Sequence, residues 1–98
     1  MRVRLAWRSG RPAVRGGRKW LIGHVAPPDW GRIFTEVLQL IGIDNQRQGN
    51  ELLLQNGHGA VSWQVKYRWS IVEVDLKGFT AQKQQLVTTA LWKSVRYG

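Results

Sequence analysis

The sequence contains no cysteine, which excludes a disulfide framework, a thiolate metal site and a thiol nucleophile. A chain without cysteine also fits a reducing compartment. Its apolar runs are far shorter than the roughly 20 residues that a membrane-spanning helix needs. The opening residues, Met1-Arg2-Val3-Arg4-Leu5, carry charge where the apolar region of a secretory signal would begin. We therefore expect a soluble cytoplasmic protein without a transmembrane segment.

Acidic residues and histidines are also few. Six Asp and Glu and two His stand against fifteen Lys and Arg. Glu73 and Asp75, on one strand face, offer only a weak cation site, and a structural or solvated role is the favoured alternative for both. There is no close carboxylate cluster, so we expect no metal site and no cofactor. The glycines do not have the spacing of a phosphate-binding loop or of a dinucleotide site. These absences weigh against a metal-dependent or nucleotide-dependent enzyme.

Positive charge is abundant and concentrated near the N-terminus. The net charge is +9, and residues 1–19 hold seven cations and no acid. Such a field attracts polyanions, nucleic acid first and an acidic protein surface next. The predicted nucleic-acid contacts are Arg2, Arg4, Arg8, Arg11, Arg15, Arg18, Lys19, Lys66 and Arg68.

The clearest structural pattern covers residues 60–69, where apolar and polar positions alternate strictly. A period of two, rich in β-branched and aromatic residues, predicts a half-buried strand. Apolar residues occupy odd positions through Ile71 and even positions from Val72. In addition, one strand over 60–76 would be about 55 Å long at about 3.3 Å per residue. We therefore predict a bulge or turn near Trp69-Ser70-Ile71.

Further strands and two amphipathic helices follow from similar patterns. The other predicted strands are residues 2–8, 19–25, 50–55 and 71–76, with residues 9–17 as a basic loop and 44–50 as a polar turn. The predicted helices are residues 29–41, capped by Asp29, and 80–96, capped by Thr80. Their apolar stripes include Leu40 and Leu86.

This order, β-β-α-β-β-β-α, predicts one α+β domain over residues 1–98. The expected architecture is a two-layer sandwich: a mainly antiparallel sheet of about five strands with both helices on one face. A basic N-terminal hairpin, residues 1–25, would join an α-β-β-β-α core, residues 29–97. The second face of the sheet would be open.

Nucleic-acid binding is the first of three predicted functions. The open face would carry Ser62, Gln64, Lys66 and Arg68 beside an arginine-faced strand. Cations of this kind attract phosphates with little sequence discrimination. An exposed ring would stack on unpaired bases, and the candidates are Trp7, Trp20 and Trp63; packing in the core is the alternative for all three. We expect a non-enzymatic domain for RNA or single strands.

Two other functions stay open. An accessory or assembly subunit would dock its basic edge on an acidic protein or a larger complex, with tryptophans as anchors. A ribonuclease would use His58, in the Asn56–Gly59 turn and beside Lys66 or Arg68, as a general base. Small ribonuclease toxins have a helix–three strands–helix order and use a histidine, but they share no motif with residues 29–97. A solvated turn histidine is the alternative.

Overall fold

Seven elements make up the computed structural model, which describes residues 2–8, 28–66 and 69–97. For Arg8, Arg96 and Tyr97 it describes the backbone alone. The strands are β1 (Arg2–Arg8), β2 (Asn45–Gln48), β3 (Glu51–Leu54), β4 (Ala60–Lys66) and β5 (Trp69–Asp75). The helices are α1 (Trp30–Leu40) and α2 (Ala81–Tyr97). In these ranges, no helix has both the length and the apolar character needed to cross a membrane.

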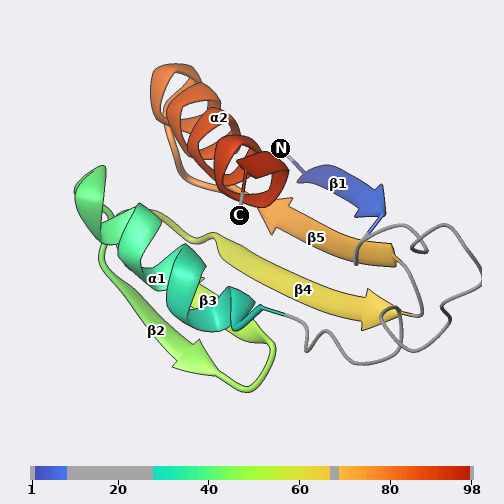
Figure 1. The fold of residues 1–98 in the computed structure, drawn as a ribbon. Helices are drawn as coiled ribbons and strands as arrows, with labels where there is room; N and C mark the ends of the chain where they lie inside the picture. Colours follow the sequence, from blue (N-terminus) through green and yellow to red (C-terminus); the bar gives the residue numbers. More distant parts are fainter. Residues whose placement is uncertain (1, 9–27, 67–68, 98) are drawn as a thin grey trace, which may run out of the picture.

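The five strands form one sheet in the order β1-β5-β4-β3-β2, and every neighbouring pair is antiparallel. Strands β2 to β5 follow one another as a meander, whereas β1 lies at the far edge against β5. Both helices cover the same face of the sheet, α1 near β2 and β3 and α2 near β1 (Figure 1). The predicted α+β fold class, with two layers and helices on one face, is confirmed.

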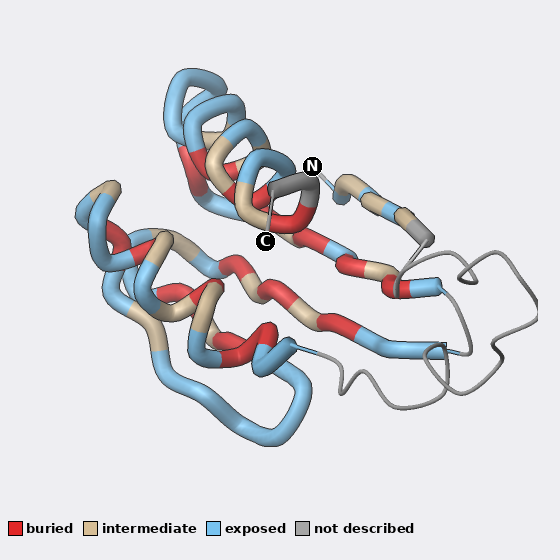
Figure 2. The backbone as a smooth tube through the Cα atoms, viewed as in Figure 1, coloured by how far each residue is buried: buried red, intermediate tan, exposed pale blue. Residues whose placement is uncertain are grey.

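The core lies between the sheet and the helices because alternate strand residues point toward α1 and α2. Figure 2 shows this alternation as buried and exposed positions along β4 and β5. The buried apolar strand residues are Leu52, Leu54, Val61, Trp63, Val72 and Val74. They meet two helix stripes: Trp30, Phe34 and Leu38 of α1, and Val87, Leu91 and Val95 of α2.

A chain of aromatic rings joins the sheet to α1. The ring centroids of Trp7 and Trp30 are 5.1 Å apart, and those of Trp30 and Phe34 are 5.5 Å apart. The ring of Phe34 meets that of Trp63 edge-on at 5.9 Å. Edge-on and offset arrangements are the favourable ones for aromatic pairs. Trp7 and Trp63 therefore belong to the packed layer between the sheet and the helices.

The apolar stripes of the helices are narrower than predicted. Leu40 is 86% exposed and Leu86 is 47% exposed. At about 100° per residue, Leu40 lies about 120° around the helix from Phe34, and Leu86 lies about 100° from Val87. Each leucine therefore points away from the buried stripe of its helix.

Residues 45–48 form the edge strand β2, where a polar turn was predicted. A tight turn at Gly49-Asn50 leads back into β3, and Gly49 has a positive φ of 57°. The segment contains no apolar residue, so it lacks the alternation by which a strand is recognised in sequence. Polar side chains are common on edge strands because they discourage pairing with other chains. The predicted strand 19–25 and loop 9–17 lie outside the described residues.

The break in the long alternating stretch lies earlier than predicted. Strand β4 ends at Lys66 and β5 begins at Trp69, and these two residues pair with each other. The predicted break near Trp69-Ser70-Ile71 is therefore wrong by about two residues. Because Lys66 and Trp69 are directly opposite in an antiparallel pair, they share a face of the sheet.

Candidate nucleic-acid interface

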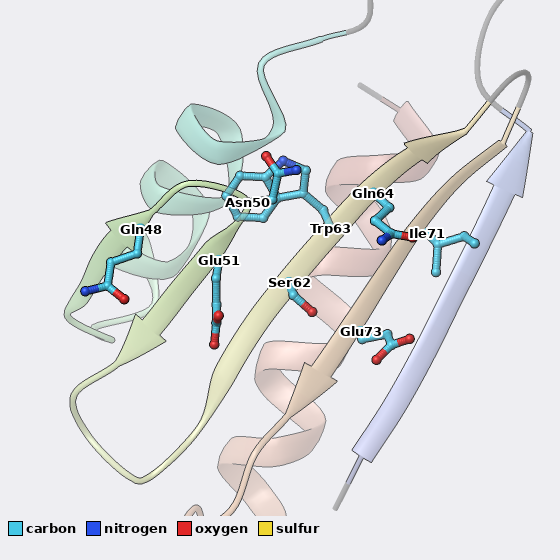
Figure 3. A pocket seen from close by; sticks show the side chains of 8 residues that line it. All are labelled: Gln48, Asn50, Glu51, Ser62, Trp63, Gln64, Ile71 and Glu73. Carbon is cyan, nitrogen blue, oxygen red and sulfur yellow. The ribbon is translucent and has the colours of Figure 1, made fainter.

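The face of the sheet that carries no helix is the candidate site, and we call it the open face. Figure 3 views it directly, with both helices behind the strands. The antiparallel register aligns its side chains in rows across the five strands. The central row consists of Arg4, Glu73, Ser62, Glu51 and Gln48.

The arginines of β1 are held beside carboxylates of β5. Arg2 lies 3.9 Å from the Asp75 carboxylate, and Arg4 lies 3.9 Å from the Glu73 carboxylate. Exposed pairs of this kind contribute about 1 kcal/mol or less to stability. Each carboxylate also offsets the positive charge of one predicted nucleic-acid contact. Strand β5 lies between β1 and β4, and its acids Glu73 and Asp75 occupy the rows of Arg4 and Arg2 and not the row of Lys66.

Charge is unevenly distributed along the strands of the open face. Asp75 lies at the end where β4 begins, and Glu73 and Glu51 lie in the central row. At the other end, Lys66 pairs with Trp69, and the backbone of Arg8 pairs with Trp69 from the β1 side. We call Lys66, Trp69 and this end of β1 the basic end. Among the described residues of the open face, the basic end has no acid.

Four of the six acids are engaged in ion pairs with arginines. Besides the two pairs of β1 with β5, Asp29 lies 3.4 Å from Arg47, and Glu36 lies 3.6 Å from Arg32. Lys66 is exposed and has no ion-pair partner among the described residues. Of the cationic side chains that the structure describes on the open face, Lys66 is therefore the one that is free to meet an external anion.

Among the described residues, Trp69 is the exposed aromatic residue of the open face. It is 51% exposed, whereas Trp63 is only 7% exposed and Trp7 packs edge-on against Trp30. Trp7 and Trp63 therefore pack in the core, which was the alternative to base stacking for both. Trp20 lies outside the described residues. The sequence pattern missed Trp69 because its odd position placed it with the apolar set of β4.

A shallow depression of about 300 Å³ lies next to the basic end on the open face. Figure 3 shows the side chains around it: Gln48, Asn50, Glu51, Ser62, Trp63, Gln64, Ile71 and Glu73. Its polar groups are amides, a hydroxyl and carboxylates, and these lining residues include no cation. The pair of Gln64 with Ile71 is the row adjacent to Lys66 and Trp69. The depression is therefore directly beside the exposed indole.

His58 lies at the opposite end of the sheet from Lys66. It precedes β4, whereas Lys66 is the last residue of β4, so about 20 Å of strand separates them. The His58 amide donates to the carbonyl of Lys77 at 2.7 Å, and its side chain is exposed. The structure does not bring His58 and Lys66 together as the ribonuclease hypothesis requires.

Five of the predicted nucleic-acid contacts cannot be placed on the open face. Arg11, Arg15, Arg18, Lys19 and Arg68 lie outside the described residues, so their role stays a prediction from sequence. Within residues 2–8, 28–66 and 69–97, no group of three or more His, Asp or Glu could hold a metal ion.

No protein-family model matches this chain, and neither a curated protein nor a solved structure matches it.

Proposed function

We propose that this protein is a non-enzymatic nucleic-acid-binding domain that holds the phosphates of RNA or of a single strand at the basic end of its sheet. The observation that carries the proposal is the separation of charge. Arg2, Arg4, Arg32 and Arg47 are paired with acids, whereas Lys66 is exposed and unpaired among the described residues. A phosphate at Lys66 therefore meets no nearby carboxylate of the open face.

Further cations lie close to the basic end in the sequence. Arg68 directly precedes Trp69, and the chain continues from Arg8 into the segment that contains Arg11, Arg15, Arg18 and Lys19. Contacts between cations and phosphates release counterions, which gives affinity with little base discrimination. The expected binding is thus sensitive to salt and tolerant of sequence.

A salt titration tests the proposal. The affinity of a labelled mixed-sequence RNA or single-stranded DNA is measured by fluorescence anisotropy between about 50 and 200 mM salt. We expect the logarithm of the association constant to fall linearly with the logarithm of the salt concentration. Lys66→Ala should reduce the slope by about 0.7, the value of one phosphate contact on a single strand. Lys93→Ala, which removes an exposed cation from α2, is the matched control and should leave the slope unchanged.

The docking subunit and the ribonuclease predict different results in these binding experiments. An absence of salt-dependent binding at low ionic strength would overturn the proposal. Retention of an acidic protein after nuclease treatment of a native extract would then identify a docking subunit. Cleavage of the RNA that disappears in His58→Ala would instead identify a ribonuclease. We expect the RNA to stay intact with the unaltered protein and with the His58→Ala variant alike.

A further inference from the structure

Trp69 is a large apolar residue that does not belong to the hydrophobic core of the described residues. It lies on the helix-free side of the sheet, where its neighbours in the register are Lys66 and the backbone of Arg8. More than half of its surface is open to solvent. Exposed aromatic rings on a positively charged surface are the groups on which single-strand-binding proteins stack unpaired bases.

We infer that the open face binds an unpaired strand, with one base stacked on Trp69 and the next base edge in the depression beside it. This inference rests on the proposed function and adds to it the form of the ligand. Stacking on an indole requires an open base face, which a base inside a duplex does not have. Every base has such a face, so stacking tolerates sequence.

The chemistry of the open face separates phosphates from bases. Lys66 offers a cation, whereas the depression offers the amides of Gln48, Asn50 and Gln64 and the carboxylates of Glu51 and Glu73. Carboxylates repel phosphates, but they accept hydrogen bonds from the amino and imino groups of bases. Amides both donate and accept, so they suit any base edge. The phosphates therefore lie at the basic end and the base edges over the depression.

The spacing along the strands fits neighbouring nucleotides. Gln64 and Ile71 are one row from Lys66 and Trp69, which is about 7 Å along the strands. A base stacked on Trp69 thus leaves its neighbour at the edge of the depression, where the Gln64 side chain points outward (Figure 3).

The breadth of the open face argues against a duplex ligand. Five strands at about 4.8 Å spacing make a sheet about 19 Å wide. The major groove of B-form DNA is about 12 Å wide, so this sheet cannot enter it face-on. Base edges reach the depression only when the strand is unpaired.

The test compares a short single-stranded oligonucleotide with a duplex of the same sequence. Trp69→Ala should weaken single-strand binding about 5- to 150-fold, because stacking of one base is lost. Duplex binding, which depends on phosphates alone, should change less than about twofold. Trp69→Phe keeps a ring and should retain most of the affinity. Trp92→Ala, which removes an exposed tryptophan from α2, is the control and should behave like the unaltered protein.

Each outcome separates this inference from the proposed function. If Trp69→Ala and Trp92→Ala lose equal affinity, or if Trp69→Ala weakens single strands and duplex equally, the stacking site is wrong while phosphate binding stands. If the unaltered protein binds neither ligand, the proposed function itself fails. Gln64→Ala should change the preference among homopolymers and leave the salt slope unchanged. An unchanged preference would remove the depression from the site.

Discussion

Trp63 and Trp69 lie on opposite faces of one sheet, although both occupy odd positions in the same alternating stretch. Trp63 pairs with Val72 and faces the helices, whereas Trp69 pairs with Lys66 and faces solvent. The two residues between β4 and β5 change the parity, because Lys66 and Trp69 share a face as a directly opposite pair. One tryptophan therefore belongs to the core and the other to the surface.

The two tryptophans should differ sharply in their contribution to stability. Trp63→Ala should lower the free energy of unfolding by about 3–5 kcal/mol, because a buried indole in contact with Phe34 is lost. Trp69→Ala should lower it by about 1 kcal/mol or less, as is usual for an exposed position. Urea unfolding followed by circular dichroism measures both values. Equal losses would contradict the opposite orientation of the two rings.

Gly59 should tolerate no side chain. A Cβ at this buried position would lie 2.4 Å from the carbonyl oxygen of Asp75 and 3.1 Å from the Phe79 ring. Since the carbonyl belongs to the backbone, Gly59→Ala should destabilise the protein by about 3 kcal/mol. Gly42→Ala is the comparison: its φ is +80° but nothing lies within 4 Å, so the loss should be about 1 kcal/mol. Denaturant titration should rank the two losses in this order, and the reverse ranking would count against the steric explanation.

The presence of Arg47 should offset the gain in stability that Gly31→Ala would otherwise give. The Arg47 guanidinium lies 3.4 Å from Asp29 and 5.7 Å from the centre of the Trp63 ring. A Cβ on Gly31 would come 2.4 Å from its Cζ atom and displace it. In the unaltered protein, Gly31→Ala should change stability little, because a gain in helix propensity of up to about 1 kcal/mol is offset by the lost contacts.

A double-mutant cycle separates these two effects. With Arg47→Ala already present, Gly31→Ala should stabilise α1 by up to about 1 kcal/mol, because no guanidinium remains to be displaced. Thermal unfolding of the four proteins measures the difference. The same effect of Gly31→Ala with and without Arg47 would show that the two residues are independent.

Neutralising Glu73 should strengthen binding of a single strand. Glu73→Gln releases Arg4 from its 3.9 Å pair and removes a negative charge from the open face. We expect affinity to rise about two- to fivefold at low salt, as a single charge contact allows, and the gain to shrink as salt increases. Glu36→Gln makes the same change in net charge on α1, where Glu36 pairs with Arg32. Equal gains in the two proteins would assign the effect to net charge alone.

The fold class could be predicted because most elements show a strong period in sequence. The stripe of Trp30, Phe34 and Leu38 predicts α1, and the alternation in β1 and β4 predicts two strands whose apolar sides meet the helices. Strand β2 could not be predicted, because an edge strand whose backbone pairs with β3 needs no apolar residue. The turn between β4 and β5 has no glycine or proline to mark it, and its position decides the face on which Trp69 lies.

The sequence pattern identifies candidate cations and the strand face on which each lies. It does not show which side chains of other strands lie next to them. Local pattern predicts that the side chains of Arg2 and Arg4 lie on the polar side of β1. It does not say that β5 is the neighbouring strand, which depends on a contact between distant parts of the chain. Only that neighbour brings Asp75 and Glu73 against the arginines. For this reason, the positive charge that the sequence predicts for the open face is higher than the charge of its central row in the structure.

The edge position of β1 has a consequence for the order of folding. Strands β2 to β5 pair with their immediate successors, so short loops join them and each hairpin forms from local contacts. Strand β1 instead pairs with β5, Arg2 with Asp75 and Arg8 with Trp69. Its docking must close a loop that contains α1 and β2 to β4, which is entropically unfavourable until the meander exists. During synthesis β1 leaves the ribosome before the meander does, and it finds its partner strand only after β5 has emerged.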